Sequence, residues 1–287
     1  MSNPESPMSD KPFDLSLFDL VLPEPDPNMK EKMLERCRTA PTAYENWAPA
    51  VEKAGVRAPD TMTVPLTFEL QEAFLEGYDL SPEAIENIDA IVKVVEEMGA
   101  KHGFPLFIKT SYTSHKHDWS RSCCLASADR TMIIQQLANI VGYQGFSPYP
   151  MSPSLLIRQM LETSPAFHAF GGMPITQEFR FFGGKGKVQG YQPYWPEDSI
   201  KEPSIQDWKA KLSVISRLST FERKKLMLAT ECVTDHLEGD WSVDFLKDRH
   251  GKWWLIDMAE AGLSYKNEKD FVQFSARPWH DDEPTMG

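Results

Sequence analysis

Two aspartates, Asp244 and Asp257, are the residues of this chain whose spacing most directly suggests chemistry. The segments around both are aromatic or β-branched, and a polar stretch with a glycine separates them, which predicts a β-hairpin. If the turn is centred between His250 and Gly251, the two aspartates lie opposite each other, with Cβ atoms about 4.5–5.5 Å apart. Like charges repel at that distance, so the pair favours a bound cation such as Mg²⁺, which takes one or two carboxylates together with substrate phosphates. The alternative is a turn that slips by one residue and puts the two side chains on opposite faces.

Glu178 and Arg180 form a second charged pair on an otherwise aromatic segment. In a strand, the alternation of side chains puts both on one face together with Phe182. If that face is buried, the pair needs polar partners, and Arg180 would suit a phosphate or a developing negative charge. The alternative is an ordinary ion pair on a solvated sheet face.

Lys109 closes a short apolar strand predicted over residues 103–109, and a loop rich in hydroxyl and basic side chains follows at 110–122. Lys109, Lys116 and the hydroxyls of this loop could surround phosphate oxygens. The alternative is a plain polar loop, with the Lys109 ammonium reaching out to solvent.

Two further patterns point to other sites. His115 and His117 precede Cys123 and Cys124, but this spacing matches no standard zinc module, and we predict that the cysteines are small core residues. The run Gly-Gly-Lys-Gly at 183–186 lacks the spacing of a phosphate-binding loop and predicts a hairpin turn.

The elements that must position these side chains are a mixture of helices and strands. Three helices are predicted from start, stop and capping signals: from Ser81-Pro82 to Gly99, after Ser127, and after the capping box of Ser219 and Glu222. Apolar runs and turns predict strands at 103–109 and 155–161 and hairpins at 177–191 and 241–258. Because hairpins predominate over strand–helix–strand crossovers in the second half, we expect an α+β fold of antiparallel sheets packed with helices.

The composition fits a folded protein of one large or two modest domains. The chain has 287 residues, of which 41% are hydrophobic and 11% aromatic, so it can bury a substantial core. Its net charge of −12 argues against a nucleic-acid partner, which would require a basic surface. The start is polar, without the pattern of a secretory signal, and no apolar run has the length of a membrane span. We therefore expect a cytoplasmic protein with four reduced cysteines and no membrane contact.

We predict four segments along the chain. Residues 1–30 form a flexible lead with one short apolar segment that would pack on its own domain or contact a partner. A mixed helical region follows at 31–100, the domain that carries the chemistry spans 101–276, and a tail ends the chain at 277–287.

Taken in order, the motifs resemble those of the ATP-grasp superfamily. They cover just over half of the chain and are FPLFIK ending at Lys109, LLIRQMLE at 155–162, EFRF at 178–181, VDF at 243–245 and LIDMAE at 255–260. Within the superfamily, the EFRxF strand and the later Tyr194-Trp195-Pro196 are similar to a phage and bacterial clade of predicted ligases. The sequence also resembles the eukaryotic cell-division-cycle family that assembles a translation initiation factor.

The resemblance implies an ATP-grasp-like fold in which two α+β subdomains with antiparallel sheets clasp ATP. In such a site Lys109 would contact the ATP phosphates, and Arg180, with Glu178 beside it, would steady the γ-phosphate or an acyl-phosphate. Asp244 and Asp257 would be the acidic Mg²⁺ ligands, in agreement with their expected facing positions.

The resemblance also implies where the base and sugar of the nucleotide would lie. The backbone of Gln159, Met160 and Leu161 would pair with adenine, and Glu162 would contact the ribose or the amino group.

Two departures from the superfamily pattern bear on turnover. No glycine-rich flap follows Lys109, and the loop in its place makes Lys116 a candidate phosphate contact. The usual Asn two residues after the second acid is Ala259, which leaves Glu260 or a bidentate Asp257 to complete a second metal site.

The resemblance therefore implies an ATP- and Mg²⁺-dependent ligase that activates a carboxylate as an acyl-phosphate and joins it to an amine or thiol. The sequence does not specify these substrates, and a peptide or protein is among the candidates. The aromatic stretch 191–195 is predicted to form part of the acceptor wall, or else a core edge. The alternatives are an ATP-binding assembly or chaperone factor that grips a partner protein without ligase turnover, and a nucleotide-binding protein that no longer uses ATP.

Overall fold

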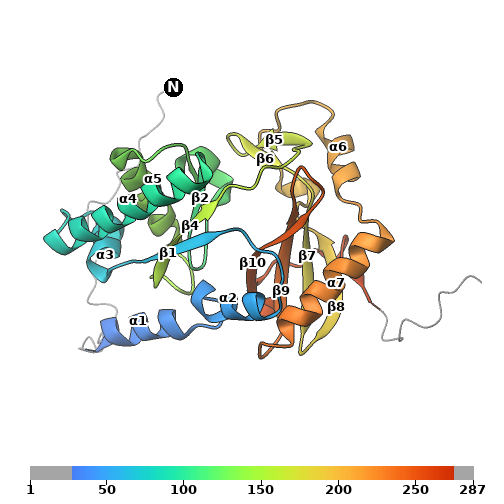
Figure 1. Cartoon of the computed structure of the whole chain (residues 1–287), viewed down its shortest axis with the longest axis horizontal. Helices are drawn as coiled ribbons and strands as arrows, with labels where there is room; N and C mark the ends of the chain where they lie inside the picture. The colour runs from blue at the N-terminus through green and yellow to red at the C-terminus, as the bar shows by residue number, and fades with distance from the viewer. Residues whose placement is uncertain (1–27, 275–287) are drawn as a thin grey trace, which may run out of the picture.

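The computed structural model describes residues 28–274 and shows two α+β halves, each an antiparallel sheet covered by helices (Figure 1). The predicted α+β class with antiparallel sheets is thereby confirmed. We call the halves the first lobe and the second lobe. Apart from residues 28–30, at the start of α1 (Met29–Thr39), the predicted lead lies outside the described residues, and so does the predicted tail.

The first lobe is built on a four-stranded sheet with the order β1-β4-β2-β3. Its elements are β1 (Thr61–Pro65), α3 (Phe68–Glu76), α4 (Pro82–His102), β2 (Leu106–Thr110), β3 (Cys124–Leu125), α5 (Arg130–Gln144) and β4 (Ser154–Gln159). Apolar side chains of α4, α5 and the sheet form one core, in which Ile91, Val95 and Leu155 are fully buried. Because β1 pairs with β4, segments on both sides of residue 100 build this sheet.

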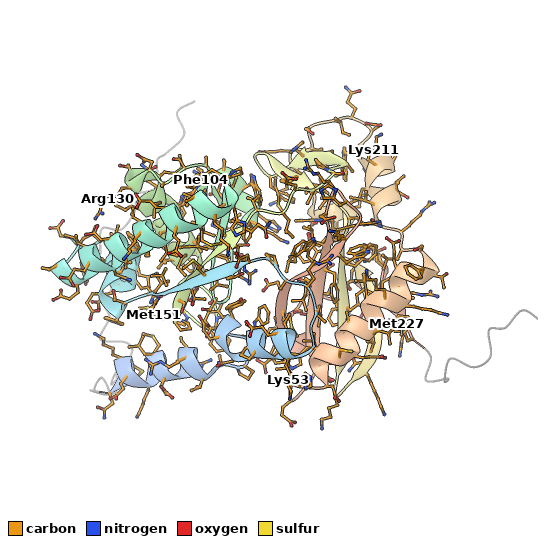
Figure 2. All side chains as sticks on the ribbon, in the orientation of Figure 1. Lys53, Phe104, Arg130, Met151, Lys211 and Met227 are labelled. Carbon is orange, nitrogen blue, oxygen red and sulfur yellow. The ribbon has the colours of Figure 1, made fainter. Side chains whose placement is uncertain are left out.

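The second lobe is built on a five-stranded sheet with the order β10-β9-β7-β8-β11. Its elements are α2 (Tyr44–Lys53), β7 (Glu178–Gly184), β8 (Lys187–Pro193), α7 (Thr220–Thr234), β9 (Trp241–Lys247), β10 (Trp253–Glu260) and β11 (Val272–Gln273). Phe179, Phe181 and Phe245 of the sheet pack with Leu226 of α7 and Trp47 of α2 in a separate aromatic core. Figure 2 shows side chains filling both halves, and Met227 of α7 belongs to the buried cluster of the second lobe.

Smaller elements complete the fold. They are η2 (Lys116–Arg121), the hairpin of β5 (Phe167–Ala169) and β6 (Met173–Ile175), η3 (Glu197–Ser199), α6 (Trp208–Ile215) and η4 (Ala261–Leu263). The β5–β6 hairpin and α6 share a third cluster of buried side chains with Trp195. No helix among residues 28–274 combines the length and apolar character needed to cross a membrane.

The predicted end of the first helix at Gly99 is wrong, because α4 continues to His102. Gly99 remains helical and lies against the ring of Phe104, where a larger side chain would clash. The helix ends at Gly103, whose φ of 75° is open to glycine at little steric cost.

The other predicted elements are present, with shifted ends. The capping box of Ser219 and Glu222 opens α7, and the helix expected after Ser127 begins at Arg130, with Asp129 as its cap. The glycine-rich run at 183–186 ends β7 and forms the turn into β8, as predicted.

The hairpin of β9 and β10 places Asp257 opposite Asp244, as predicted, but the strand register between this pair and the turn differs from the prediction. Near the turn the register is one residue off the prediction, because Trp253 pairs with Lys247 and Leu255 with Phe245. A β-bulge between Leu255 and Asp257 then inserts Ile256 and restores the facing pair. Without this bulge, Asp244 would face Ile256.

The hydrogen bonds of the turn explain why the register beside it is shifted by one residue. The Asp248 carboxylate accepts hydrogen bonds from the backbone N–H groups of His250 and Lys252, at 2.9 and 2.8 Å, and Gly251 has a φ of 75°. This side-chain-capped loop centres the turn on His250 rather than between His250 and Gly251.

Candidate functional site

A cavity of about 410 Å³ lies between the two lobes, within the size range of small-molecule sites. Strands β2 and β4 and the loop after β2 contribute side chains from the first lobe, and β7, β9 and β10 contribute them from the second. The charged residues that line it are Lys109, Lys116, Arg158, Glu178, Arg180, Asp244 and Asp257. All but Arg158 were predicted as site residues.

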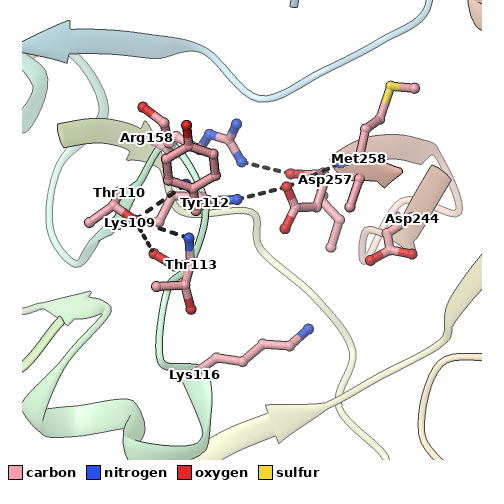
Figure 3. Close-up of polar contacts among 12 residues, drawn as sticks. Lys109, Thr110, Tyr112, Thr113, Lys116, Arg158, Asp244, Asp257 and Met258 are labelled. Carbon is pink, nitrogen blue, oxygen red and sulfur yellow. Dashed lines mark hydrogen bonds and ion pairs between the residues drawn. The ribbon is translucent and has the colours of Figure 1, made fainter. Parts of the chain in front are cut away.

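Lys109 of β2 reaches across the cavity to Asp257 of β10 (Figure 3). Its Nζ donates a hydrogen bond of 2.7 Å to Oδ1 of Asp257, and the lysine side chain is only 2% exposed. Burial lowers the pKa of Lys109 more than the neighbouring carboxylate raises it. Burial alone would raise the pKa of Asp257, but Lys109 and Arg158 hold it below its usual value. The alternative of a solvent-exposed Lys109 is therefore wrong.

Arg180 of β7 pairs with Asp244 of β9, which lies directly opposite it on the neighbouring strand. The contact is bidentate, since Nε and Nη2 donate to the two carboxylate oxygens at 2.7 and 2.8 Å. Both side chains are largely buried. The face of β7 that carries Arg180 is therefore not a solvated sheet face, and the alternative of an ordinary ion pair on such a face is wrong. Burial alone would lower the pKa of Arg180, but Asp244 raises it above its usual value.

Lys116, at the start of η2, pairs with Glu178 of β7 across the same cavity. Its Nζ lies 3.0 Å from Oε1 of Glu178 and 3.7 Å from the ring centroid of Tyr194. Arg180 also lies near this ring, with its Cζ 4.8 Å from the Tyr194 ring centroid. Burial raises the pKa of Glu178, although Lys116 opposes the shift.

Arg158 is the site residue that the sequence reasoning missed. It stands on the central strand β4, is 4% exposed, and donates a hydrogen bond of 2.6 Å from Nη1 to the carbonyl oxygen of Ile256. The signal was present in the sequence, because Arg158 interrupts an apolar strand in the same way that Arg180 does. Its register opposite Phe107 puts it on the same face of the sheet as Lys109.

Most basic side chains of the cavity come from the first lobe, and all of its acidic side chains come from the second. Lys109, Lys116 and Arg158 come from the first lobe, and each contacts an acceptor on β7 or β10 of the second lobe. With four basic and three acidic side chains in its lining, the cavity carries one excess positive charge. Such a lining suits an anionic ligand that brings its own counter-cation.

The segment after β4 lines the cavity only in part as expected. Gln159, Met160 and Leu161 all contribute to its wall. Glu162 does not line it, and its carboxylate pairs instead with the exposed Arg249 at 2.6 Å. Of the predicted acceptor wall, Tyr194 lines the cavity, whereas Tyr191 packs in the core of the second lobe.

The loop that follows β2 contributes two histidines to the wall. His115 stacks on Tyr143 with ring centroids 4.0 Å apart, and His117 stacks on Phe170 at 4.6 Å. Burial lowers the pKa of both imidazoles. Within residues 28–274, no group of three or more His, Cys, Asp or Glu side chains is arranged to hold a metal ion. Cys123 is buried and all four cysteines are free thiols.

The donor set on the second lobe fits one hard cation. Asp244 and Asp257 face each other and both line the cavity, which supplies the one or two carboxylates that Mg²⁺ takes when phosphate oxygens complete its shell. Ala259 also lines the cavity but offers no side-chain ligand. The residues therefore fit Mg²⁺ that arrives with phosphates, rather than a closed cage of protein ligands.

No protein-family model matches the chain, and no curated protein is significantly similar to it in sequence. Several solved structures are similar. Cdc123 from Schizosaccharomyces pombe is 14% identical with a TM-score of 0.47, over 80% of this chain and 85% of that chain. D-alanine–D-alanine ligase from Bacillus anthracis, complexed with ATP, is 12% identical with a TM-score of 0.37, over 76% of this chain and 52% of that chain. The ATP-grasp ligase PsnB, complexed with a precursor peptide and AMPPNP, is 11% identical with a TM-score of 0.37, over 76% and 49%.

The chain spans most of Cdc123 but only about half of each of the two ligases. Because the identities are 14% or less and the TM-scores lie below 0.5, what this chain binds has to be inferred from its own cavity.

Proposed function

We propose that this chain binds ATP with Mg²⁺ between its two lobes and uses it to join a carboxylate to an amine or thiol, as ATP-grasp ligases do. The observation that carries the proposal is the facing pair of Asp244 and Asp257, each held by a buried cation in one cavity. Facing carboxylates, basic side chains on both lobes and a cavity of this volume together suit a triphosphate and its metal.

Five of the seven charged side chains in the lining then have roles that their positions support. Lys109 and Lys116 would bind phosphate oxygens from the first lobe, and Arg180 would bind the transferred phosphoryl group from the second. Asp244 and Asp257 would hold Mg²⁺, which when bound neutralises charge on the β- and γ-phosphates. The backbone of residues 159–161 would contact adenine, while Glu162 would have to leave Arg249 to contact the ribose.

The reaction needs no nucleophile from the protein. An oxygen of the substrate carboxylate attacks the γ-phosphorus, the bond from that phosphorus to the β–γ bridging oxygen breaks, and ADP leaves. The amine or thiol then attacks the acyl carbon of the acyl-phosphate, loses its proton, and expels inorganic phosphate. The chain contributes orientation and charge neutralisation, mainly through Arg180 and Lys109.

Binding of Mg²⁺-ATP would require the charged side chains of the cavity to exchange their present ion pairs for contacts with the ligand. Arg180 and Lys109 now pair with the aspartates, so the phosphates would have to replace the carboxylates on these cations while Mg²⁺ replaces the cations on the carboxylates. The one excess positive charge of the lining would offset part of the net negative charge of Mg²⁺-ATP.

Ala259 favours a second candidate function. An apolar side chain lines the cavity where the superfamily pattern has an Asn ligand, which weakens a second metal site more than it weakens binding. In this alternative the chain is an ATP-dependent assembly or chaperone factor, and the nucleotide stabilises a shape that grips a partner protein without turnover.

Trapping with hydroxylamine tests the ligase proposal without knowledge of the amine. Hydroxylamine attacks an acyl-phosphate and leaves a stable hydroxamate, so pools of small carboxylates and of peptides can be screened with ATP and Mg²⁺. The ligase proposal predicts ADP and hydroxamate in equal amounts, both lost in Asp257→Asn. Mg²⁺-dependent nucleotide binding without any hydroxamate would favour the assembly factor, and absence of nucleotide binding would contradict both.

A further inference from the structure

The bulge that brings Asp257 opposite Asp244 is held from the other lobe. Inserting Ile256 into β10 removes that residue from the regular ladder of hydrogen bonds. Ile256 is partly buried, and its carbonyl group needs another donor there. Nη1 of Arg158 supplies it at 2.6 Å, as a charge-assisted hydrogen bond across the lobe boundary (Figure 3).

Arg158 lines the cavity and is also well placed to act on the backbone of β10. It lies on β4, between β1 and β2 in the middle of the first sheet, where the backbone is fixed on both sides. Its guanidinium Cζ lies 5.0 Å from the ring centroid of Tyr44, so the group is also held by an aromatic face. These contacts orient Nη1 toward the bulge.

The contacts from the first lobe fall on two consecutive residues of β10. Arg158 binds the backbone of Ile256, and Lys109 binds the side chain of Asp257. Arg158 therefore fixes the position of the strand, while Lys109 fixes the carboxylate that the strand carries. Loss of the Arg158 contact would favour the regular register, in which Ile256 faces Asp244 and the acidic pair is separated.

We infer that Arg158 is a positioning residue that holds the β10 bulge in the register that makes Asp244 and Asp257 a joint metal site. The part of this inference that concerns metal rests on the proposed function, whereas the part that concerns the register does not.

The test compares Arg158→Met, which keeps the length of the side chain without its donors, with Arg158→Lys, which keeps the charge but not the planar fork. The matched control is Arg57→Met. Arg57 also packs against β10, with its guanidinium 5.2 Å from the Trp254 ring centroid, but its side chain does not bind the bulge. Circular dichroism identifies any variant that fails to fold, and Arg158→Lys then serves as the informative variant.

The first readout is amide hydrogen exchange in the segment 254–258, measured without nucleotide. We expect Arg158→Met to raise exchange there by roughly tenfold or more, the effect of losing one charged hydrogen bond, with Arg158→Lys intermediate and Arg57→Met unchanged. Unchanged exchange in both Arg158 variants would overturn the inference, whatever the protein binds.

The second readout is the Mg²⁺ concentration that half-saturates binding of ATP. A positioning role predicts that Arg158→Met raises it by roughly tenfold and leaves the metal-free affinity for ATP within about threefold. A direct phosphate contact would instead weaken metal-free binding as well, and that result would contradict the positioning role. If the wild type binds no nucleotide, the proposed function fails, and the exchange experiment alone decides the inference.

Discussion

Each of the two facing aspartates is neutralised by a different cation, and the two pairs differ in kind. Arg180 and Asp244 belong to one sheet and form a bidentate contact between neighbouring strands. Lys109 and Asp257 belong to different lobes and form a single hydrogen bond at the cavity. The second pair is therefore the one that links the site to the relative position of the lobes.

Asp257→Asn should destabilise the protein as well as weaken the proposed metal site. The substitution leaves the buried ammonium of Lys109 without its anion, and we expect a loss of about 1–3 kcal/mol in the free energy of unfolding at pH 7. The loss stays below that of a fully enclosed pair because the Asp257 side chain is 39% exposed. Urea unfolding measures it.

The control is Asp89→Asn, since Asp89 pairs with Arg130 at an exposed site and should change stability by less than about 0.5 kcal/mol. The direction in which this stabilisation changes with pH follows from the pKa of Asp257. The pKa of Asp257 is lowered by folding, so its contribution is present above the unfolded value of 3.8 and is lost as the pH falls through the folded value. Equal stability of the two variants would contradict the role given to the Lys109–Asp257 pair.

Arg180→Ala should reduce turnover more than it reduces affinity for nucleotide, because the arginine is assigned to the transferred phosphoryl group. Its removal also frees Asp244, so Mg²⁺ affinity should not fall. Single-turnover rates and equilibrium binding measured on the same preparation separate the two effects. A loss of affinity as large as the loss of rate would assign Arg180 to ground-state binding only.

At the scale of elements, the β9–β10 hairpin shows which features the alternation of residue types predicts correctly and which it does not. Alternation and the glycine predicted both strands and the correct facing pair, yet the assumed turn was wrong by one position. The bulge at Ile256 compensates for that shift, and nothing in the local sequence marks it. Its partner is Arg158, about a hundred positions earlier in the chain, and a reading of local patterns does not connect the two.

Helix α7 offers a prediction that depends on pH. Glu222 closes the capping box with Ser219 and also accepts a hydrogen bond of 2.6 Å from Lys247 of β9. These hydrogen bonds outweigh burial and lower its pKa from 4.5 to about 2. The stabilisation is therefore present above pH 4.5 and is lost as the pH falls from there to about 2.

Glu222→Gln should accordingly be less stable than the wild type at pH 7, by about 2–3 kcal/mol at most. The difference should shrink steadily below pH 4.5, because Glu222 of the unfolded wild type is protonated first, whereas the folded carboxylate keeps its charge until about pH 2. Urea unfolding at pH 7 and near pH 3 measures both quantities, and a difference that does not vary with pH would contradict the account of this helix start.

At the scale of the whole molecule, the two lobes have separate cores and meet at a cavity with complementary charges. The sequence predicted the fold class and six of the seven charged residues in the cavity, because each lies in a recognisable local motif. It could not predict which charge would pair with which, because Lys109 and Asp257 are joined only by the folding of both lobes. For the same reason, the pairing of Glu162 with Arg249 was not anticipated.

A ligand that binds both lobes should stabilise the molecule as a unit. The cavity walls come from both sheets, so a bound nucleotide would add contacts that the unfolded chain cannot make. At a concentration about 100-fold above Kd, one such ligand adds about 2.7 kcal/mol, which is several degrees in Tm for a chain of this size.

Thermal unfolding with and without ATP and Mg²⁺, on the wild type and on Asp257→Asn, is the most direct test of the central claim. We expect an increase of several degrees in the Tm of the wild type that requires both ATP and Mg²⁺. In Asp257→Asn, the Mg²⁺-dependent part of the increase should disappear relative to the Tm of the variant alone. A wild type whose Tm does not change, or changes equally without Mg²⁺, would contradict a metal–nucleotide site at Asp244 and Asp257.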